Sequence, residues 1–155
     1  MREFPRQFYS SAQVRELDRR AIASGIAGHA LMQRAAAAAF RELLRRWPKA
    51  GRLSVFCGPG NNGGDGYELA RLARRAGMEV ELFALGTPKS GDAVSARQAW
   101  QKDGGEARDY RRQAPAGEVI VDAIFGIGLG RAPGAAAPGA TRGMAPARRA
   151  GRGGV

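Results

Sequence analysis

The sequence predicts an α/β fold built on a mostly parallel β-sheet. Two helical segments come first, and short apolar runs then alternate with amphipathic segments, which is the pattern of a parallel sheet covered by helices. The chain has 155 residues, of which 44% are hydrophobic and 25% are charged. These proportions are typical of one globular domain that buries its own core.

Residues 10–47 predict two helices. The first begins at a capping box, in which Ser10 is the N-cap and Gln13 reaches back to it, and its apolar residues recur at helical spacing. The second covers residues 30–47, and Pro48 ends it because proline cannot continue a helix. Three large aromatic side chains are expected to anchor the core: Phe40, Trp47 and Trp100.

The remaining elements alternate between strands and helices. Apolar runs predict buried strands at residues 53–57, 80–85 and 118–125, and a further short strand at 106–110. Helices are expected over 64–77 and 93–102, with Asp92 as the cap of the second. Three arginines are expected to form a solvated helix face: Arg71, Arg74 and Arg75.

Positive charge marks a separate segment at the C-terminal end. The chain carries a formal net charge of +11, from 25 Lys and Arg against 14 Asp and Glu. Residues 132–155 consist almost entirely of Ala, Gly, Pro and Arg, with no acidic residue. Such a segment has too little apolar surface to offset the entropy that it would lose on ordering. We therefore predict a folded domain over residues 1–131 and a disordered basic tail over 132–155.

Cysteine content and hydropathy predict a cytoplasmic protein. The single cysteine, Cys57, excludes an internal disulfide framework and fits a reducing compartment. No apolar run approaches the roughly 20 residues that span a bilayer, so no membrane contact is expected. Cys57 ends a buried strand, so we interpret it as a packing residue. His29 has no partner at metal-ligand spacing and is interpreted as structural or surface-exposed.

A glycine-rich turn at residues 58–66 follows the first strand. Gly58, Gly60 and Gly63 match the G-x-G-x-x-G pattern of dinucleotide-binding turns, and Glu79 or Glu81 lies where a ribose-binding acid is expected. A nicotinamide-dependent oxidoreductase is therefore one interpretation of this segment.

The polar residues of this turn favour a different ligand chemistry. Asn61, Asn62 and Asp65 present carbonyl and carboxylate oxygens, and Asp65 would repel a phosphate at the start of the helix. Oxygen-rich turns suit a hard cation or the hydroxyl and amide groups of a ligand. The turn at 126–130 should lie at the same sheet edge, so we expect Asp65 and Asp122 to meet there, with a cation, a proton or a donor-rich ligand between them.

Three segments carry a family resemblance. Residues 57–66 resemble the signature of the YjeF N-terminal domain, the NAD(P)H-hydrate epimerase family. Residues 121–129 are similar to the second motif of that family, with Ile127 where threonine is usual, and the two leading helices resemble its opening segment. The resemblance covers residues 8–137 and has its motifs in the family's order.

The resemblance implies a Rossmann-like three-layer sandwich and a repair activity. Members of the family interconvert the R and S forms of hydrated NAD(P)H, called NAD(P)HX, so that an ADP- or ATP-dependent NAD(P)H-hydrate dehydratase can recover all of it. It also implies a potassium ion at Asn62 and Asp122, and we take Asp65 as the candidate catalytic acid or base. The implied substrate-binding residues are Asn61, Asn62, Gly63, Gly64, Asp65, Gly126, Ile127, Gly128, Leu129, Gly130, Arg131 and Ala132.

The sequence departs from the family after the second motif. The family continues with further strands and an Asp-x-Pro-Ser-Gly-like motif, and nothing in residues 132–155 resembles them. We therefore expect a truncated or frame-shifted member, without a fused dehydratase domain, whose sheet is incomplete at the C-terminus. The family tends to form dimers, so a homodimer is one expected assembly.

A third interpretation is that the chain belongs to this family but has no catalytic activity. A YjeF-type domain also serves as a non-catalytic binding or scaffold module, and the arginine-rich tail would then bind RNA through its phosphates. Such binding would be non-specific, and no specific nucleic-acid partner is expected.

Overall fold

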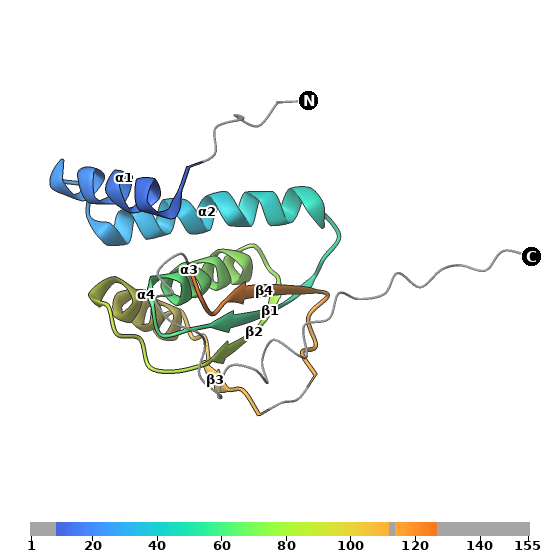
Figure 1. The fold of residues 1–155 in the computed structure, drawn as a ribbon. Helices are drawn as coiled ribbons and strands as arrows, with labels where there is room; N and C mark the ends of the chain where they lie inside the picture. The colour runs from blue at the N-terminus through green and yellow to red at the C-terminus, as the bar shows by residue number, and fades with distance from the viewer. Residues whose placement is uncertain (1–8, 112–113, 127–155) are drawn as a thin grey trace, which may run out of the picture.

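The computed structural model describes residues 9–111 and 114–126, and the predicted tail lies outside them. The elements in chain order are α1 (Ser11–Ala23), α2 (Gly28–Arg46), β1 (Arg52–Cys57), α3 (Asn61–Arg75), β2 (Glu79–Ala84), α4 (Gly91–Lys102), β3 (Arg108–Asp109) and β4 (Val119–Ala123). The strands form one sheet in the order β3-β2-β1-β4, and every neighbouring pair is parallel (Figure 1). The predicted α/β class with a parallel sheet is confirmed.

The described helices lie together on one side of the sheet (Figure 1). The chain steps from β1 through α3 to β2, and from β2 through α4 to β3, in one direction across the sheet. Right-handed crossovers in one direction place their helices on the same face. Helix α3 packs directly on the strands, α2 and α4 pack on α3, and α1 packs on α2.

Alternation along β1 divides the core between the two faces of the sheet. Leu53, Val55 and Cys57 are fully buried in the larger cluster, together with apolar residues of α2, α3 and α4. Phe56 points to the other face and stacks on Phe83, with 5.0 Å between ring centroids. The two central strands, β1 and β2, therefore contribute to two apolar layers, and the helices pack against the larger one.

Helix α3 begins earlier than its sequence predicts. The predicted start was residue 64, whereas the helix begins at Asn61 with Gly60 as an extended N-cap. Asn61 and Asn62 consequently belong to the first helical turn and not to the preceding loop. Tertiary packing overrides the poor helix propensity of Gly63 and Gly64, which are both buried.

Helix α4 is capped by Ser90 and not, as the sequence predicts, by Asp92. The Ser90 hydroxyl accepts a hydrogen bond from the Ala93 backbone N–H at 3.2 Å. Asp92 is the second residue of the helix, and the dipole of α4 stabilises its negative charge there. Its carboxyl group is thus free to face a neighbouring helix.

Two further predictions about side chains need correction. Trp100 is buried and Phe40 partly buried, but Trp47 is 48% exposed because it is the C-cap residue beyond the last turn of α2. Arg71 is not on a solvated face: its side chain is only 12% exposed and lies between the carboxylates of Glu68 and Asp103. Glu68, which is buried, requires that counter-charge.

Candidate functional site

The turn between β1 and α3 closes tightly against the end of β4. The Gly58 backbone N–H donates to the Ala123 carbonyl at 3.0 Å, and a side chain on Gly58 would overlap the Ile124 carbonyl. A side chain on Gly63 would in turn overlap the Gly58 carbonyl. These two glycines are needed because backbone atoms approach where a Cβ would stand.

Gly126, the described residue of the second predicted glycine-rich turn, lies at this edge of the sheet. A Cβ placed on Gly126 would stand 3.1 Å from the Cβ of Asn62, so the segment after β4 passes over the first turn of α3. The neighbouring Asn61 accepts a short hydrogen bond from the Ser90 hydroxyl, which joins the starts of α3 and α4. Ile127, Gly128, Leu129, Gly130, Arg131 and Ala132 lie outside the described residues.

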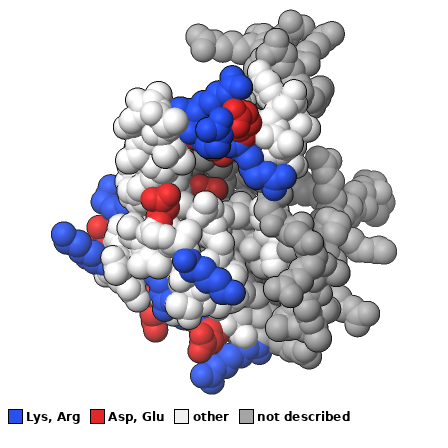
Figure 2. Space-filling model, turned by 60° about the vertical axis from the view of Figure 1, so that its left-hand side comes forward, with Lys and Arg blue, Asp and Glu red and all other residues white. Residues whose placement is uncertain are grey.

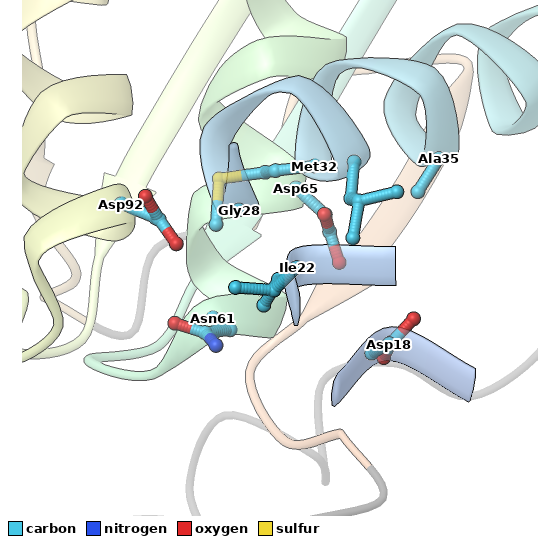
Figure 3. A pocket seen from close by; sticks show the side chains of 9 residues that line it. Asp18, Ile22, Gly28, Met32, Ala35, Asn61, Asp65 and Asp92 are labelled. Carbon is cyan, nitrogen blue, oxygen red and sulfur yellow. The ribbon is translucent and has the colours of Figure 1, made fainter. Parts of the chain in front are cut away.

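A cavity of about 170 Å³ opens beside this turn, between the four helices (Figure 3). Its polar groups are three carboxyls and one amide, and its walls are otherwise apolar. None of the described residues that line it is basic. The lining residues are Asp18 and Ile22 from α1, Gly28, Leu31, Met32 and Ala35 from α2, Asn61 and Asp65 from α3, and Asp92 from α4.

Asp65 is the half-buried carboxyl of this cavity. Burial, and then the negative charge of Asp18, raise the pKa of Asp65 to about 6. A carboxyl group with such a pKa exchanges its proton close to neutral pH, which suits a general acid or base. Asp65 is thus the described cavity residue that fits proton transfer best.

Asp122 does not share this cavity, and the expectation that it meets Asp65 is wrong. In the parallel pairing of β4 with β1, Asp122 stands beside Phe56, so its side chain is on the sheet face away from α3. Its carboxylate is exposed and accepts a hydrogen bond from the Ile124 backbone N–H at 3.0 Å. Gly126 approaches the start of α3, but Asp65 and Asp122 lie on different faces of the sheet.

The carboxyl groups that do accompany Asp65 are Asp18 and Asp92, which the sequence prediction missed. Asp18 and Ile22 are four residues apart and therefore share one face of α1, which was the available sequence signal. Asp92 gave no such signal, because only the packing of α4 on α3 brings it to the cavity.

The acid required by the dinucleotide interpretation lies at the wrong end of the sheet. Glu79 begins β2 and forms an exposed ion pair with Arg52 at 2.7 Å. Glu81 lies on the sheet face away from α3, where its carboxylate accepts a hydrogen bond from the Ser54 hydroxyl at 2.9 Å. A ribose acid would have to follow the carboxyl end of β2, next to the turn. Neither glutamate fulfils the role.

Charged side chains of both signs lie on the face of the molecule that Figure 2 presents. Figure 2 shows acidic and basic side chains interspersed over this face of the molecule, without a continuous basic surface. Within residues 9–111 and 114–126, no helix combines the length and the apolarity needed to cross a bilayer. The same residues contain no cluster of three His, Cys, Asp or Glu side chains suited to a metal ion.

Comparisons with known proteins agree on one family. Residues 28–141 match the family model described as YjeF-related protein N-terminus. The chain is 44% identical over 124 residues to the bifunctional NAD(P)H-hydrate repair enzyme Nnr of Coxiella burnetii, and the match covers 78% of this chain and 25% of that protein. It is 37% identical over 140 residues to the NAD(P)H-hydrate epimerase of Rhodobacter capsulatus, with 81% and 64% covered.

A solved structure supports the same fold. The crystal structure of yeast ynu0 is similar with a TM-score of 0.78 and 21% identity, over 89% of this chain and 64% of that one. The chain thus spans about a quarter of the length of the bifunctional relative and less than two thirds of the epimerase. Because the family model matches more than half of the chain, this protein belongs to the YjeF-related N-terminal domain family.

Proposed function

We propose that this protein epimerises the R and S forms of NAD(P)HX. The observation that carries the proposal is the half-buried Asp65, whose pKa lies at about 6 in a cavity beside the glycine-rich turn. The names of the relatives, an NAD(P)H-hydrate epimerase and a bifunctional NAD(P)H-hydrate repair enzyme, support the same substrate. The chain would accordingly be an isomerase that acts in nicotinamide nucleotide repair.

The proposed reaction needs one proton donor that is also a proton acceptor. The hydrated ring carbon carries a hydroxyl group next to the ring nitrogen. Protonated Asp65 gives its proton to that hydroxyl and the carbon–oxygen bond breaks. A water molecule departs, and the ring becomes an iminium cation. Water then adds to the other face and returns a proton to Asp65, so the centre is inverted with no net gain or loss of atoms. The carboxylate also stabilises the cation between these two steps.

The remaining substrate contacts are proposed at the two turns. Asn61, Asn62, Gly63 and Gly64 form the first turn of α3 together with Asp65, and Gly126 packs over it. Ribose hydroxyls and a ring carboxamide donate hydrogen bonds, and the amide and carboxylate oxygens of these residues can accept them. Residues Ile127 to Ala132 are proposed to complete the site.

A potassium ion is proposed at Asn62 and Asp122. Amide and carboxylate oxygens are suitable donors for a hard cation, and the contact of Gly126 with Asn62 brings the chain that follows β4 to the start of α3. When bound, the ion would supply positive charge at this edge. Asn62 and Asp122 would hold it there, whereas the proton transfer stays with Asp65.

The proposed partner is an ADP- or ATP-dependent NAD(P)H-hydrate dehydratase that acts on the S form. The relatives named as bifunctional repair enzymes support this pairing. A reduced, buried Cys57 supports a cytoplasmic location, and a homodimer is the proposed assembly.

The test is direct conversion of one separated epimer. The purified full chain is incubated with R-NADHX, and the two epimers are separated by chromatography over time against spontaneous conversion. We expect faster equilibration with the protein, and loss of that acceleration in Asp65→Asn. Equal rates with and without protein would contradict the activity. Tighter binding of NADH than of NADHX would favour the oxidoreductase, and steeply salt-dependent RNA binding would favour the scaffold module.

A further inference from the structure

Helix α1 contributes side chains to the candidate site although it precedes the segment that the family model matches. The match begins at residue 28, whereas α1 covers Ser11–Ala23. No residue of α1 is buried, and among the described helices and strands the partner that it packs on is α2. It nevertheless places Asp18 and Ile22 in the wall of the cavity that holds Asp65.

Among the described residues that line the cavity, those with charged side chains besides Asp65 come from two helices. The four cavity residues of α2 are uncharged, and the other α3 residue at the cavity is the amide Asn61. The charged groups are therefore Asp18 from α1 and Asp92 from α4. Figure 3 shows the Asp65 carboxyl on the side of the cavity nearer Asp18, and Asp92 on the other side of Met32.

Resting on the proposed function, we propose that Asp18 is a positioning residue that acts through Asp65: by facing it with a second negative charge, α1 keeps a proton on the Asp65 carboxyl. Asp18 itself neither gives nor takes a proton in the reaction. The proton moves from Asp65 to the substrate hydroxyl and back from the added water, as described above. Helix α1 is thus part of the acid–base machinery without touching the reacting atoms.

The electrostatics agree with this geometry. Burial is the larger cause of the raised pKa of Asp65, and the charge of Asp18 is the other cause. Asp92 lines the same cavity but does not contribute to that shift. Asp18→Asn and Asp92→Asn are therefore matched substitutions, because each removes one carboxylate from the same cavity.

The first test measures the proton on Asp65 directly and needs no activity. Carbon-13 NMR of labelled aspartate side chains follows the titration of Asp65 in the full chain, with Asp65→Asn used for assignment. We expect Asp18→Asn to lower the pKa from about 6 toward, but not to, the ordinary 3.8, because burial remains. Asp92→Asn should change it much less. An unchanged pKa in Asp18→Asn, or an equal decrease in both variants, would overturn the inference.

The second test separates a charge effect from a structural one. If Asp18→Asn lowers the pKa of Asp65 by about 0.5, about threefold less Asp65 is protonated at alkaline pH. Epimerisation should then lose about threefold in kcat above pH 7, with KM little changed, and Asp18→Glu should restore it. A uniform loss at all pH values, not rescued by glutamate, would contradict the inference. If the wild-type chain shows no epimerisation, the proposed function fails, but the NMR titration still decides the role of Asp18.

Discussion

Asp122 of β4 stands beside Phe56 of β1 in the parallel sheet, and both side chains point away from α3. Phe56 is buried there against Phe83 and Tyr110, whereas Asp122 is exposed at the end of its strand. The candidate site is therefore divided: the proton-transfer group Asp65 lies between the helices, whereas Asp122, one of the two proposed cation ligands, points to the other face of the sheet. Substitutions should separate the two functions.

Removing the Asp122 carboxylate should weaken the response to potassium without changing the Asp65 cavity. We expect KCl to raise the Tm of the wild-type chain more than choline chloride at equal ionic strength, and Asp122→Asn to lose that difference. Asparagine keeps an oxygen that can accept the Ile124 N–H, so the fold should persist. Asp109→Asn, on an exposed residue of β3, is the control and should retain the response. A full potassium response in Asp122→Asn would contradict the assignment.

Replacing Asp65 by asparagine should stabilise the protein at neutral and alkaline pH. The pKa of Asp65 in the folded state, about 6, is above its ordinary value of 3.8, so folding favours the protonated form. The wild-type chain therefore loses stability as the pH rises from about 4 through about 6, and the variant lacks that loss. We expect a gain of about 1 kcal/mol at pH 8, after allowance for the solvent around a half-buried group, and almost none at pH 4.

Urea unfolding at the two pH values measures this difference. A variant that is less stable than the wild type at pH 8 would show that the carboxylate of Asp65 has a stabilising partner in the folded protein, and would contradict the assigned pKa.

The glycines of the turn should differ sharply in their tolerance of a methyl group. Gly63→Ala places a Cβ onto the Gly58 carbonyl, and we expect a loss of about 1–3 kcal/mol in the free energy of unfolding. Gly60→Ala is the matched control, because no heavy atom lies within 4 Å of its Cβ position and its φ of −96° suits alanine. Equal stabilities of the two variants would mean that the turn does not close as described.

The buried ion pair between α3 residues should matter more than its exposed neighbour. The Arg71 guanidinium lies 2.8 Å from the Glu68 carboxylate, whose side chain is only 5% exposed. Arg71→Met leaves that carboxylate without its main counter-charge and should cost about 3 kcal/mol. Arg75→Met removes an exposed partner of Asp103 and should cost less than about 1 kcal/mol. Similar losses in urea unfolding would indicate that Glu68 is more solvated than its exposure implies.

The order of elements and the α/β class followed from the sequence alone. Capping at Ser10, the stop at Pro48 and the apolar runs around Val55, Leu82 and Val121 are local signals that depend on residues near one another in the chain. The position of the glycine-rich turn at the carboxyl edge also followed, because parallel strands place their ends together. For the same reason the approach of Gly126 to Asn62 was predictable.

Which acids share a cavity was decided by the tertiary structure. The face of the sheet that carries Asp122 depends on the register of β4 with β1, and a shift of one residue would reverse it. Asp18 and Asp92 reach Asp65 only because α1 packs on α2 and α4 packs on α3, contacts between segments distant in the chain. The sequence by itself therefore identified the turn and its oxygen donors. The packing of four helices selected the partners of Asp65, since burial and charge act through space and not along the chain.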